Sequence, residues 1–221
     1  MVKIKESLLV FVVITLCFGN TDGPDKIFMS VYYESNCPDS KSFVLNQLVP
    51  AVSLLKDSLS LRLVPFGKSR SINHGNDGFE CQHGPRECFG NLVHDCSLDL
   101  MQDRSMEEQV AYVACEMETE AGSRGDLTCV QKSDFSVDDL HQCVMFGRGV
   151  ELQLESEYLT KLVMPKFVPT VTFDGVFNQQ IQDMAQIDLI ATICSILRNT
   201  KSCAQYYNSQ ALQDMTQFSY E

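Results

Sequence analysis

The chain of 221 residues contains no tryptophan, no N-glycosylation sequon and few basic residues. Lysine and arginine together number 17, against 29 aspartates and glutamates, so the formal net charge is −12. A nucleic-acid binder needs a basic surface, so we expect no nucleic-acid partner. Apolar residues make up 44% and charged residues 21%, a globular balance that excludes collagen-like and wholly disordered chains.

Long apolar runs are also missing, and we expect no membrane span. The run from Leu8 to Phe18 follows Lys3 and Lys5 and covers eleven residues, whereas a spanning helix needs about 20. This pattern predicts a secretory signal peptide over residues 1–19, cut after Gly19. Residues 20–221 are then a single domain, whose 15 basic and 28 acidic residues also argue against anionic membrane surfaces as partners.

Cysteine, by contrast, is abundant. The chain has ten cysteines, far more than a cytosolic protein of this length carries, which indicates an oxidising environment. Cys17 would leave with the signal peptide. Nine cysteines remain, so eight can pair and one thiol is left over, and an odd thiol in a secreted protein suggests a function.

The first part of the domain predicts a β-α-β unit. Residues 27–34 are apolar on both faces, as in a central strand. A helix is expected over 38–56, with a kink at Pro50. Residues 59–63 alternate in hydrophobicity and predict a second strand that ends at Pro65. Cys37 lies where the first strand meets the helix.

Residues 68–164 differ from what precedes them, because the apolar helical patterns are short and six cysteines lie here. We predict a helical insertion held by disulfides, with a loop over 71–79. Ser105 and Glu108 have the spacing of a capping box, which predicts a helix over 105–118. Ser136 marks a second, weaker helix start.

The sheet is expected to resume after Pro169. Residues 170–173 and 176–177 flank Asp174-Gly175, a hairpin signal. One more helix is expected over 184–197, followed by a polar tail after Cys203 that frays. The order resembles a thioredoxin fold, which implies a cysteine at a helix start and a proline, often cis, before the strand that follows.

Residues 81–96 carry the most specific motif, CQHGPRECFGNLVHDC. It resembles the signature CQHGxxECxxNxxxxC of the gamma-interferon-inducible lysosomal thiol reductase (GILT) family. The resemblance covers most of the chain after residue 19 and implies an α/β thioredoxin-like fold with a disulfide-rich helical insertion. The matching residues are Cys81, Gln82, His83, Gly84, Glu87, Cys88, Asn91 and Cys96.

The resemblance also implies a site for thiol–disulfide exchange on protein substrates, with no cofactor. Cys37 would be the nucleophile and Pro169 would shape the substrate groove. Enzymes of this family carry Cys-x-x-Cys, but the fourth position here is Ser40, whose alcohol cannot act as a resolving thiol. Scaffold disulfides would use Cys81, Cys88, Cys96, Cys115, Cys129, Cys143, Cys194 and Cys203.

Three questions about this site stay open. The helix start stabilises a thiolate at Cys37, whereas Glu34 and Asp39 oppose it. His83 is a candidate acid or base or, alternatively, a packed residue of the motif. Zinc ligation by Cys81, His83, Cys88, His94 and Cys96 fits no finger spacing, so we expect disulfides and no metal; His74 and His141 are expected on the surface.

The sequence thus supports two hypotheses: a monothiol oxidoreductase with weak turnover, and a non-catalytic extracellular protein that binds a protein or cell-surface partner. Arg124, Gly125 and Asp126 form an integrin-type tripeptide that would serve the second, or arise by chance. Without a sequon, N-glycan-directed delivery is disfavoured. We therefore expect secretion, with a lysosomal location as the alternative.

Overall fold

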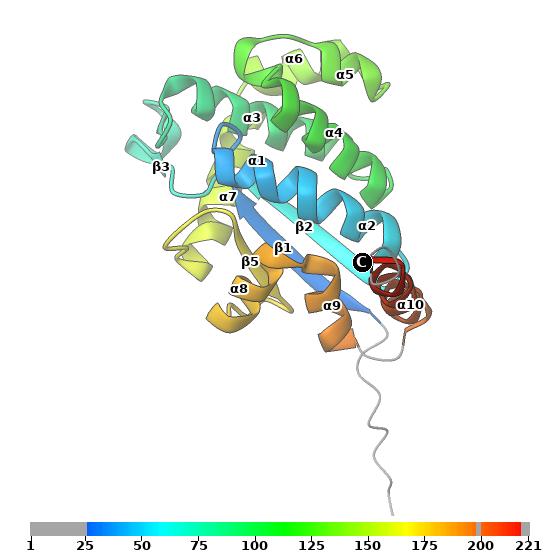
Figure 1. Cartoon of the computed structure of the whole chain (residues 1–221). Coiled ribbons are helices and arrows are strands. Elements are labelled where there is room, and N and C mark those ends of the chain that lie inside the picture. Colours follow the sequence, from blue (N-terminus) through cyan, green and yellow to red (C-terminus); the bar gives the residue numbers. More distant parts are fainter. Residues whose placement is uncertain (1–25, 198–199, 218–221) are drawn as a thin grey trace, which may run out of the picture.

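The computed structural model describes residues 26–197 and 200–217. The expected signal peptide therefore lies outside the described residues. A sheet of three strands lies at the centre, in the order β2-β1-β5, with β1 parallel to β2 and antiparallel to β5. Figure 1 shows helices packed on both sides of this sheet. The strands are β1 (Ile27–Tyr33), β2 (Leu59–Pro65) and β5 (Thr170–Phe173).

The two faces of β1 enter different parts of the interior, because successive side chains of a strand point to opposite sides. Met29, Val31 and Tyr33 belong to the main core, which also contains apolar side chains of the first helical segment. Tyr32 packs in a smaller cluster with Val64 on the opposite face. Both faces of the central strand are therefore buried.

The predicted first helix is present, in three parts: α1 (Pro38–Phe43), the π-helical turn η1 (Val44–Leu48) and α2 (Val49–Leu55). The irregularity lies just before Pro50. A proline has no backbone N–H to donate to the preceding turn, and π-helical turns, although rare, occur mostly as single-turn bulges inside α-helices. The apolar side chains Phe43, Val44, Leu48, Val52 and Leu55 are all buried.

Residues 68–164 hold longer helices than the apolar pattern predicts. The helices are α3 (Pro85–Leu100), α4 (Met106–Thr119), α5 (Thr128–Lys132), α6 (Val137–Met145) and α7 (Arg148–Val163), with a short turn η3 (Gly122–Arg124) between α4 and α5. The capping box at Ser105 is confirmed, and Ser136 caps α6.

Helices α3 and α7 have 16 residues each, although the apolar patterns in this region are short. Both bury polar side chains, which masks the apolar periodicity. On α3, for instance, Asn91 and Asp95 are buried, and Gln153 and Ser156 of α7 donate hydrogen bonds of 2.6 and 3.0 Å to Asp95. The interface between these helices is held by a polar network, which hydropathy does not detect.

The loop predicted over 71–79 joins two short paired strands, β3 (Arg70–Ser71) and β4 (Phe79–Glu80), and includes the short 3-10 turn η2 (Asn73–Gly75). His74 lies on the exposed surface there, as predicted, and so does His141 on α6.

The predicted turn after β5 is present, with positive φ at both Asp174 and Gly175. The second arm of the hairpin is reduced to one bridge between Phe173 and Val176. The single helix expected next is two helices, α8 (Gln179–Ile187) and α9 (Leu189–Leu197), separated at Asp188, which has an extended backbone. The expected fraying tail was wrong as well, since the chain forms α10 (Lys201–Gln217), tied to α9 by the disulfide Cys194–Cys203.

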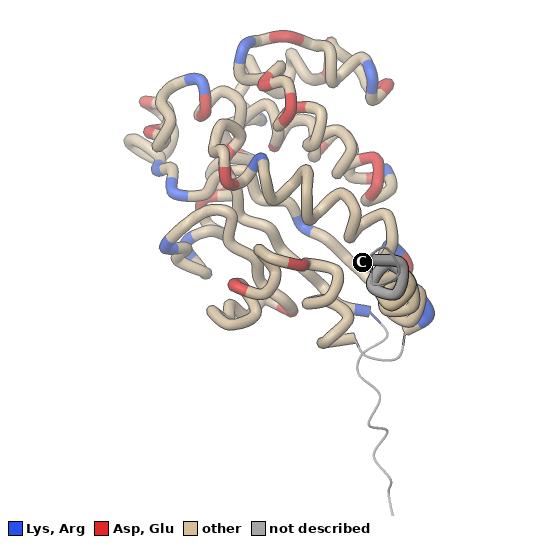
Figure 2. The backbone as a smooth tube through the Cα atoms, in the orientation of Figure 1, with Lys and Arg blue, Asp and Glu red and all other residues tan. Residues whose placement is uncertain are grey.

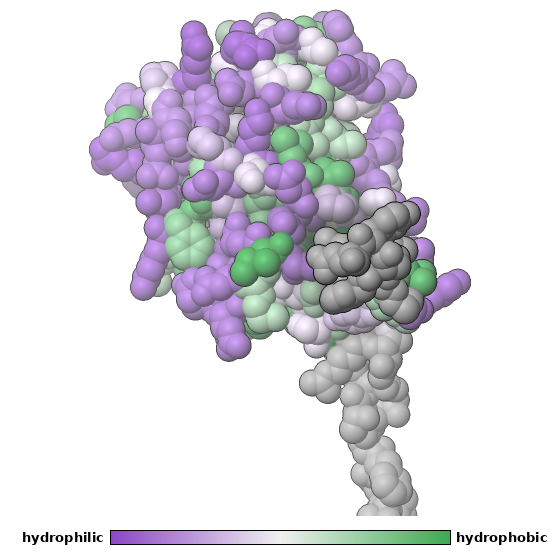
Figure 3. Space-filling view, in the orientation of Figure 1, coloured by the Kyte–Doolittle hydropathy of each residue, from purple (hydrophilic) through white to green (hydrophobic). Residues whose placement is uncertain are grey.

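Charged and apolar residues are both distributed over the surface. Figure 2 shows acidic positions spread over the helices with basic positions between them. Figure 3 shows green, apolar side chains breaking a mostly purple face in its lower half, where α8 lies, and α8 exposes Met184 and Ile187. Within the described residues, none of the helices combines the length and the hydropathy needed to cross a membrane.

Candidate functional site around Cys37

Cys37 occupies the turn between β1 and α1. Its backbone N–H donates to the carbonyl of Glu34 at 3.2 Å, and its own carbonyl accepts from Lys41 at 2.9 Å. Pro38 follows as the first helical residue, a position where the missing N–H has no cost. Cys37 is 6% exposed. A cavity of about 220 Å³ lies beside it, lined in part by Lys41 and Met117.

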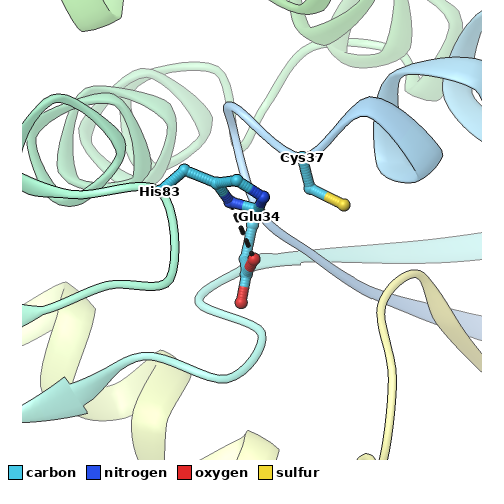
Figure 4. Close-up of side chains that lie close together, drawn as sticks. All are labelled: Glu34, Cys37 and His83. Carbon is cyan, nitrogen blue, oxygen red and sulfur yellow. Dashed lines mark ion pairs between the residues drawn. The ribbon is translucent and has the colours of Figure 1, made fainter.

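Glu34, Cys37 and His83 converge at this turn. One reactive atom from each side chain lies within 4.8 Å of those of the other two. Figure 4 shows the imidazole of His83 close to both the carboxylate of Glu34 and the sulfur of Cys37. Nδ1 of His83 lies 3.5 Å from Oε2 of Glu34 and 2.5 Å from Oε2 of Glu87. These types of side chain can also bind a metal ion.

Glu34 is a buried acid with an unusual environment. Burial raises its pKa from 4.5 to about 7, and the nearby Glu87 carboxylate adds to the rise, although a hydrogen bond from the backbone N–H of Lys68 opposes it. The side-chain amide of Gln82 also faces this carboxylate, and with its nitrogen turned toward Glu34 it donates to the two carboxylate oxygens at 3.2 and 3.3 Å. Gly67 has a φ of +57°, and a Cβ there would lie 2.5 Å from Cγ of Glu34. A glycine is needed at this contact.

Residues in the first half of α3 form hydrogen bonds with the turn between β1 and α1. Asn91 accepts a hydrogen bond of 2.8 Å from the backbone N–H of Ser35, and Ser35 donates from its hydroxyl to the carbonyl of Glu87 at 3.1 Å. Gly90 permits this contact, because a Cβ there would lie 2.5 Å from Oγ of Ser35. The residues of the sequence motif therefore border the turn that carries Cys37.

The remaining motif residues shape the loop before α3. Gly84 precedes the helix with a φ of +85°, a conformation that favours glycine. Cys81 and Cys88 close this loop as a disulfide. Cys96 is bonded to Cys143, which ties α3 to α6.

The described cysteines form four disulfides and leave one free thiol. The other two bonds are Cys115–Cys129 and Cys194–Cys203, and Cys37 is the free cysteine. Cys81, Cys88 and Cys96 are therefore oxidised and cannot offer thiolates to zinc. His94 lies elsewhere, buried on α3 with Nδ1 3.0 Å from the hydroxyl of Tyr33, and burial lowers its pKa to about 3.

Ser40 is buried in the first turn of α1, where its hydroxyl accepts a hydrogen bond of 3.4 Å from the backbone N–H of Glu34. No hydrogen bond joins Ser40 to the sulfur of Cys37 in the described part of the chain. The Ser40 hydroxyl instead holds the turn between β1 and α1.

Pro169 follows a cis peptide bond from Val168, as the thioredoxin-like order predicts. It lines a groove of about 510 Å³ between α1, η1 and α8. The Gln182 side chain fixes this segment: its amide donates to the carbonyl of Pro169 at 3.1 Å, and its oxygen accepts from Val171 N–H at 2.7 Å. The groove begins beside Asp39, two residues after Cys37.

The Arg124-Gly125-Asp126 tripeptide has local structural roles. Arg124 donates to the carbonyl of Thr119 at the end of α4, at 2.6 Å. Asp126 accepts from the backbone N–H of Thr128 at 2.7 Å, at the start of α5. Both charged groups are exposed, and each has a hydrogen-bond partner within five residues along the chain.

The meeting of Glu34 with His83 was missed from the sequence. The two residues are far apart in the chain, and only the motif around His83 and the position of Glu34 three residues before Cys37 drew attention to them.

Comparison with known proteins agrees with this geometry. A family model described as gamma interferon inducible lysosomal thiol reductase (GILT) matches residues 28–133. GILT-like protein 1 of Drosophila melanogaster is 33% identical over 185 residues, which cover 76% of this chain and 74% of that protein. The chain belongs to the GILT family.

Two further relatives extend this match. The gamma-interferon-inducible lysosomal thiol reductase-like protein of Anopheles gambiae is 33% identical over 207 residues, covering 87% of this chain and 84% of that protein. The gamma-interferon-inducible lysosomal thiol reductase of Carassius auratus is 31% identical over 184 residues, covering 80% of this chain and 71% of that protein.

Solved structures show the fold of this GILT-family chain. Reduced DsbA from Mycobacterium tuberculosis superposes with a TM-score of 0.53 at 13% identity, covering 81% of this chain and 86% of that chain. Reduced DsbG from the same organism superposes with a TM-score of 0.52 at 15% identity, covering 80% of this chain and 83% of that chain. The fold is thioredoxin-like, as the order of elements predicts.

Proposed function

We propose that this GILT-family protein is a thiol–disulfide oxidoreductase of the monothiol type that acts on disulfides of protein substrates. The observation that supports this most directly is the position of Cys37. It is the free thiol of the described chain, at a helix start, and its side chain meets His83. Backbone amides at a helix start favour the thiolate, which is the attacking species.

The reaction needs one protein thiolate. The sulfur of Cys37 attacks one sulfur of the substrate disulfide, a bond forms between them, and the other substrate sulfur leaves as a thiolate that takes a proton. The mixed disulfide is released when an external thiol, or a second cysteine of the substrate, attacks it. Because Ser40 cannot perform that step, turnover is slow.

The groove beside Pro169 is the proposed binding surface for the substrate peptide. Its lining is rich in side-chain amides, which can hydrogen-bond to a peptide backbone, and it includes Asp39, two residues after Cys37. We place the whole unit over residues 20–221, with 68–164 as an insertion and 1–19 as a signal peptide. The protein is then secreted; a lysosomal location is the alternative, as the names of several relatives state for those proteins.

A second candidate function is binding without turnover, favoured by Ser40 and by the small exposure of Cys37. Such a protein would keep the scaffold and recognise an extracellular or cell-surface protein. The groove at Pro169 and the Arg124-Gly125-Asp126 turn are its candidate contact surfaces.

A reductase assay from pH 4 to pH 8 decides between the two candidates. The wild type should form a mixed disulfide with a disulfide-bonded peptide and release it slowly when an external thiol is added, whereas Cys37→Ser should do neither. A wild type that forms no mixed disulfide at any pH, while folded with a free Cys37, would contradict the oxidoreductase proposal and leave the binding function.

A further inference from the structure

His83 is the part of the motif that comes nearest to the free thiol. The loop that carries it is closed by Cys81–Cys88 and begins α3. Its imidazole lies close to Glu34 and to the sulfur of Cys37 (Figure 4), and its Nδ1 also contacts Glu87. The side chain of His83 is 38% exposed, whereas those of Glu34 and Glu87 are fully buried. The imidazole therefore lies between the buried acids and the solvent, from which a substrate would approach.

The hydrogen bonds of His83 determine which nitrogen is free. Nδ1 lies 2.5 Å from Oε2 of Glu87, and the backbone N–H of His83 donates to Oε1 of the same carboxylate at 3.0 Å. A carboxylate accepts hydrogen bonds, so Nδ1 carries the proton in the neutral ring. Nε2 is then a lone-pair acceptor, on the part of the ring that faces Cys37 in Figure 4.

This arrangement has the three parts of an activated nucleophile. Cys37 is the nucleophile, His83 is a base beside it, and Glu87 orients the base from a buried position. The two hydrogen bonds that Glu87 accepts fix both the backbone and the imidazole of His83. A histidine that served only packing would not need a dedicated carboxylate on Nδ1 and a free Nε2 toward a thiol.

We propose that His83 is a catalytic residue that exchanges a proton with Cys37, and that Glu87 is its positioning residue. The exchange step rests on the function proposed above. Nε2 of His83 takes the proton from the thiol, and the thiolate attacks the substrate disulfide. The departing substrate sulfur then receives that proton from His83, so the step yields one mixed disulfide and one free thiol.

The charged groups around His83 and Cys37 determine how proton transfer between these two residues depends on pH. Glu34 lies within 4.8 Å, Lys68 follows Gly67 beside Glu34, Asp39 lies in the first turn of α1, and Lys41 and Glu120 line the cavity at Cys37. Negative charge on Glu34 stabilises a protonated His83 and opposes a thiolate on Cys37. The pH profile of the thiol therefore depends on both His83 and Glu34.

The test is the rate at which iodoacetamide alkylates Cys37 between pH 4 and pH 9, with a chelator present throughout. We compare the wild type with His83→Gln and, as a matched control, His141→Gln, which changes an exposed histidine on α6. His83→Gln should slow alkylation at neutral pH by about tenfold or more and shift the rise in rate to higher pH. His141→Gln should match the wild type.

Glu87 needs a different pair of variants. Glu87→Gln keeps an oxygen that can accept from Nδ1, whereas Glu87→Ala does not. As a positioning residue, Glu87 should show a large loss of rate in the alanine variant and partial rescue in the glutamine variant, with melting temperatures measured for both. Equal rates in these two variants, at similar stability, would contradict the role of Glu87.

Alkylation needs no disulfide substrate, so the two proposals can fail separately. A rate and profile of His83→Gln equal to those of the wild type would overturn the role of His83, even if the protein exchanges disulfides. A strong dependence on His83 in a protein that never forms mixed disulfides would support the proton transfer and overturn the oxidoreductase function.

Discussion

The side-chain oxygen of Asn91 accepts a hydrogen bond of 2.8 Å from the backbone N–H of Ser35, two residues before Cys37. This bond joins α3 to the turn at the end of β1, and both residues are buried. Gly90 lies next to Asn91 and leaves room for Ser35 and Ser123. The motif on α3 thus fixes the backbone from which the reactive thiol projects.

Removing this bond should affect both stability and the site. Asn91→Ala leaves the buried N–H of Ser35 without a partner, which costs about 1–3 kcal/mol. We expect a loss of this size in denaturant unfolding and slower alkylation of Cys37. The control is Asn208→Ala on an exposed position of α10. An Asn91→Ala protein with wild-type stability would show that water replaces the bond.

A second prediction concerns the missing resolving thiol. Ser40→Cys places a thiol in the first turn of the helix that Cys37 begins, and resolution within one molecule reaches effective molarities of about 10⁵ M or more. Steady-state reduction of a disulfide substrate should rise clearly above that of the wild type. The double variant Cys37→Ser, Ser40→Cys is the control for attack by the new thiol alone. A folded Ser40→Cys protein as slow as the wild type would mean that residue 40 cannot reach the mixed disulfide.

A third prediction follows from the buried Glu34. Its pKa of about 7 in the folded protein exceeds the ordinary 4.5, so between these values the native state holds a proton that the unfolded chain releases. Rising pH therefore favours unfolding through this group. The wild type should lose more thermal stability between pH 4.5 and pH 7.5 than Glu34→Gln does.

Other buried groups make the comparison with the variant necessary. Burial also raises the pKa of Asp95 and Glu116, which act in the same direction, whereas the lowered pKa of His94 acts in the opposite one, since unfolding allows it to gain a proton. Glu118→Gln, at an exposed acid on α4, serves as the control. Parallel pH curves for the wild type and Glu34→Gln would mean that Glu34 does not titrate in this range.

The elements that the sequence predicts well are those with a local cause. Ser105 and Glu108 sit three residues apart and form the capping box, and Asp174-Gly175 forms the turn. Helices α3 and α7 leave only a weak apolar pattern in the sequence, because their buried contacts are polar, as between Asp95 and Gln153. No local pattern reports such a network.

The site divides in the same way. The helix start at Cys37 and the cis Pro169 follow from the order of elements, and the motif identified the loop around His83. The contact of that loop with Cys37 could not be predicted, because it depends on how α3 packs beneath the turn through Asn91 and Ser35. This packing joins residues 56 positions apart.

A fourth prediction separates the roles of two disulfides. Cys96–Cys143 spans 47 positions and Cys81–Cys88 spans 7, so chain entropy predicts contributions of about 4 and about 2.5 kcal/mol. We expect the double serine variant of Cys96 and Cys143 to be poorly secreted or unfolded. The double serine variant of Cys81 and Cys88 should fold, melt at a lower temperature and alkylate slowly, because the loop of His83 is freed. The reverse order of stabilities would contradict this assignment.

The last prediction concerns substrate preference in the groove beside Pro169. The charged residues lining it are the acids Asp39 and Asp183, on α1 and α8, and its other polar residues are mostly amides. A peptide with lysine or arginine near its disulfide gains Coulomb attraction of about 1 kcal/mol from one carboxylate at contact distance in water, or about fivefold in rate. We therefore expect basic peptides to form the mixed disulfide with Cys37 faster than acidic peptides of the same length, with a difference that shrinks in high salt. Asp183→Asn should reduce the preference by about that factor, while Asp138→Asn on α6, outside the groove, should leave it unchanged. Equal rates for basic and acidic peptides at low salt would show that the peptide does not lie along α8, and the contact surface would then have to be sought at the cavity of Lys41 and Met117.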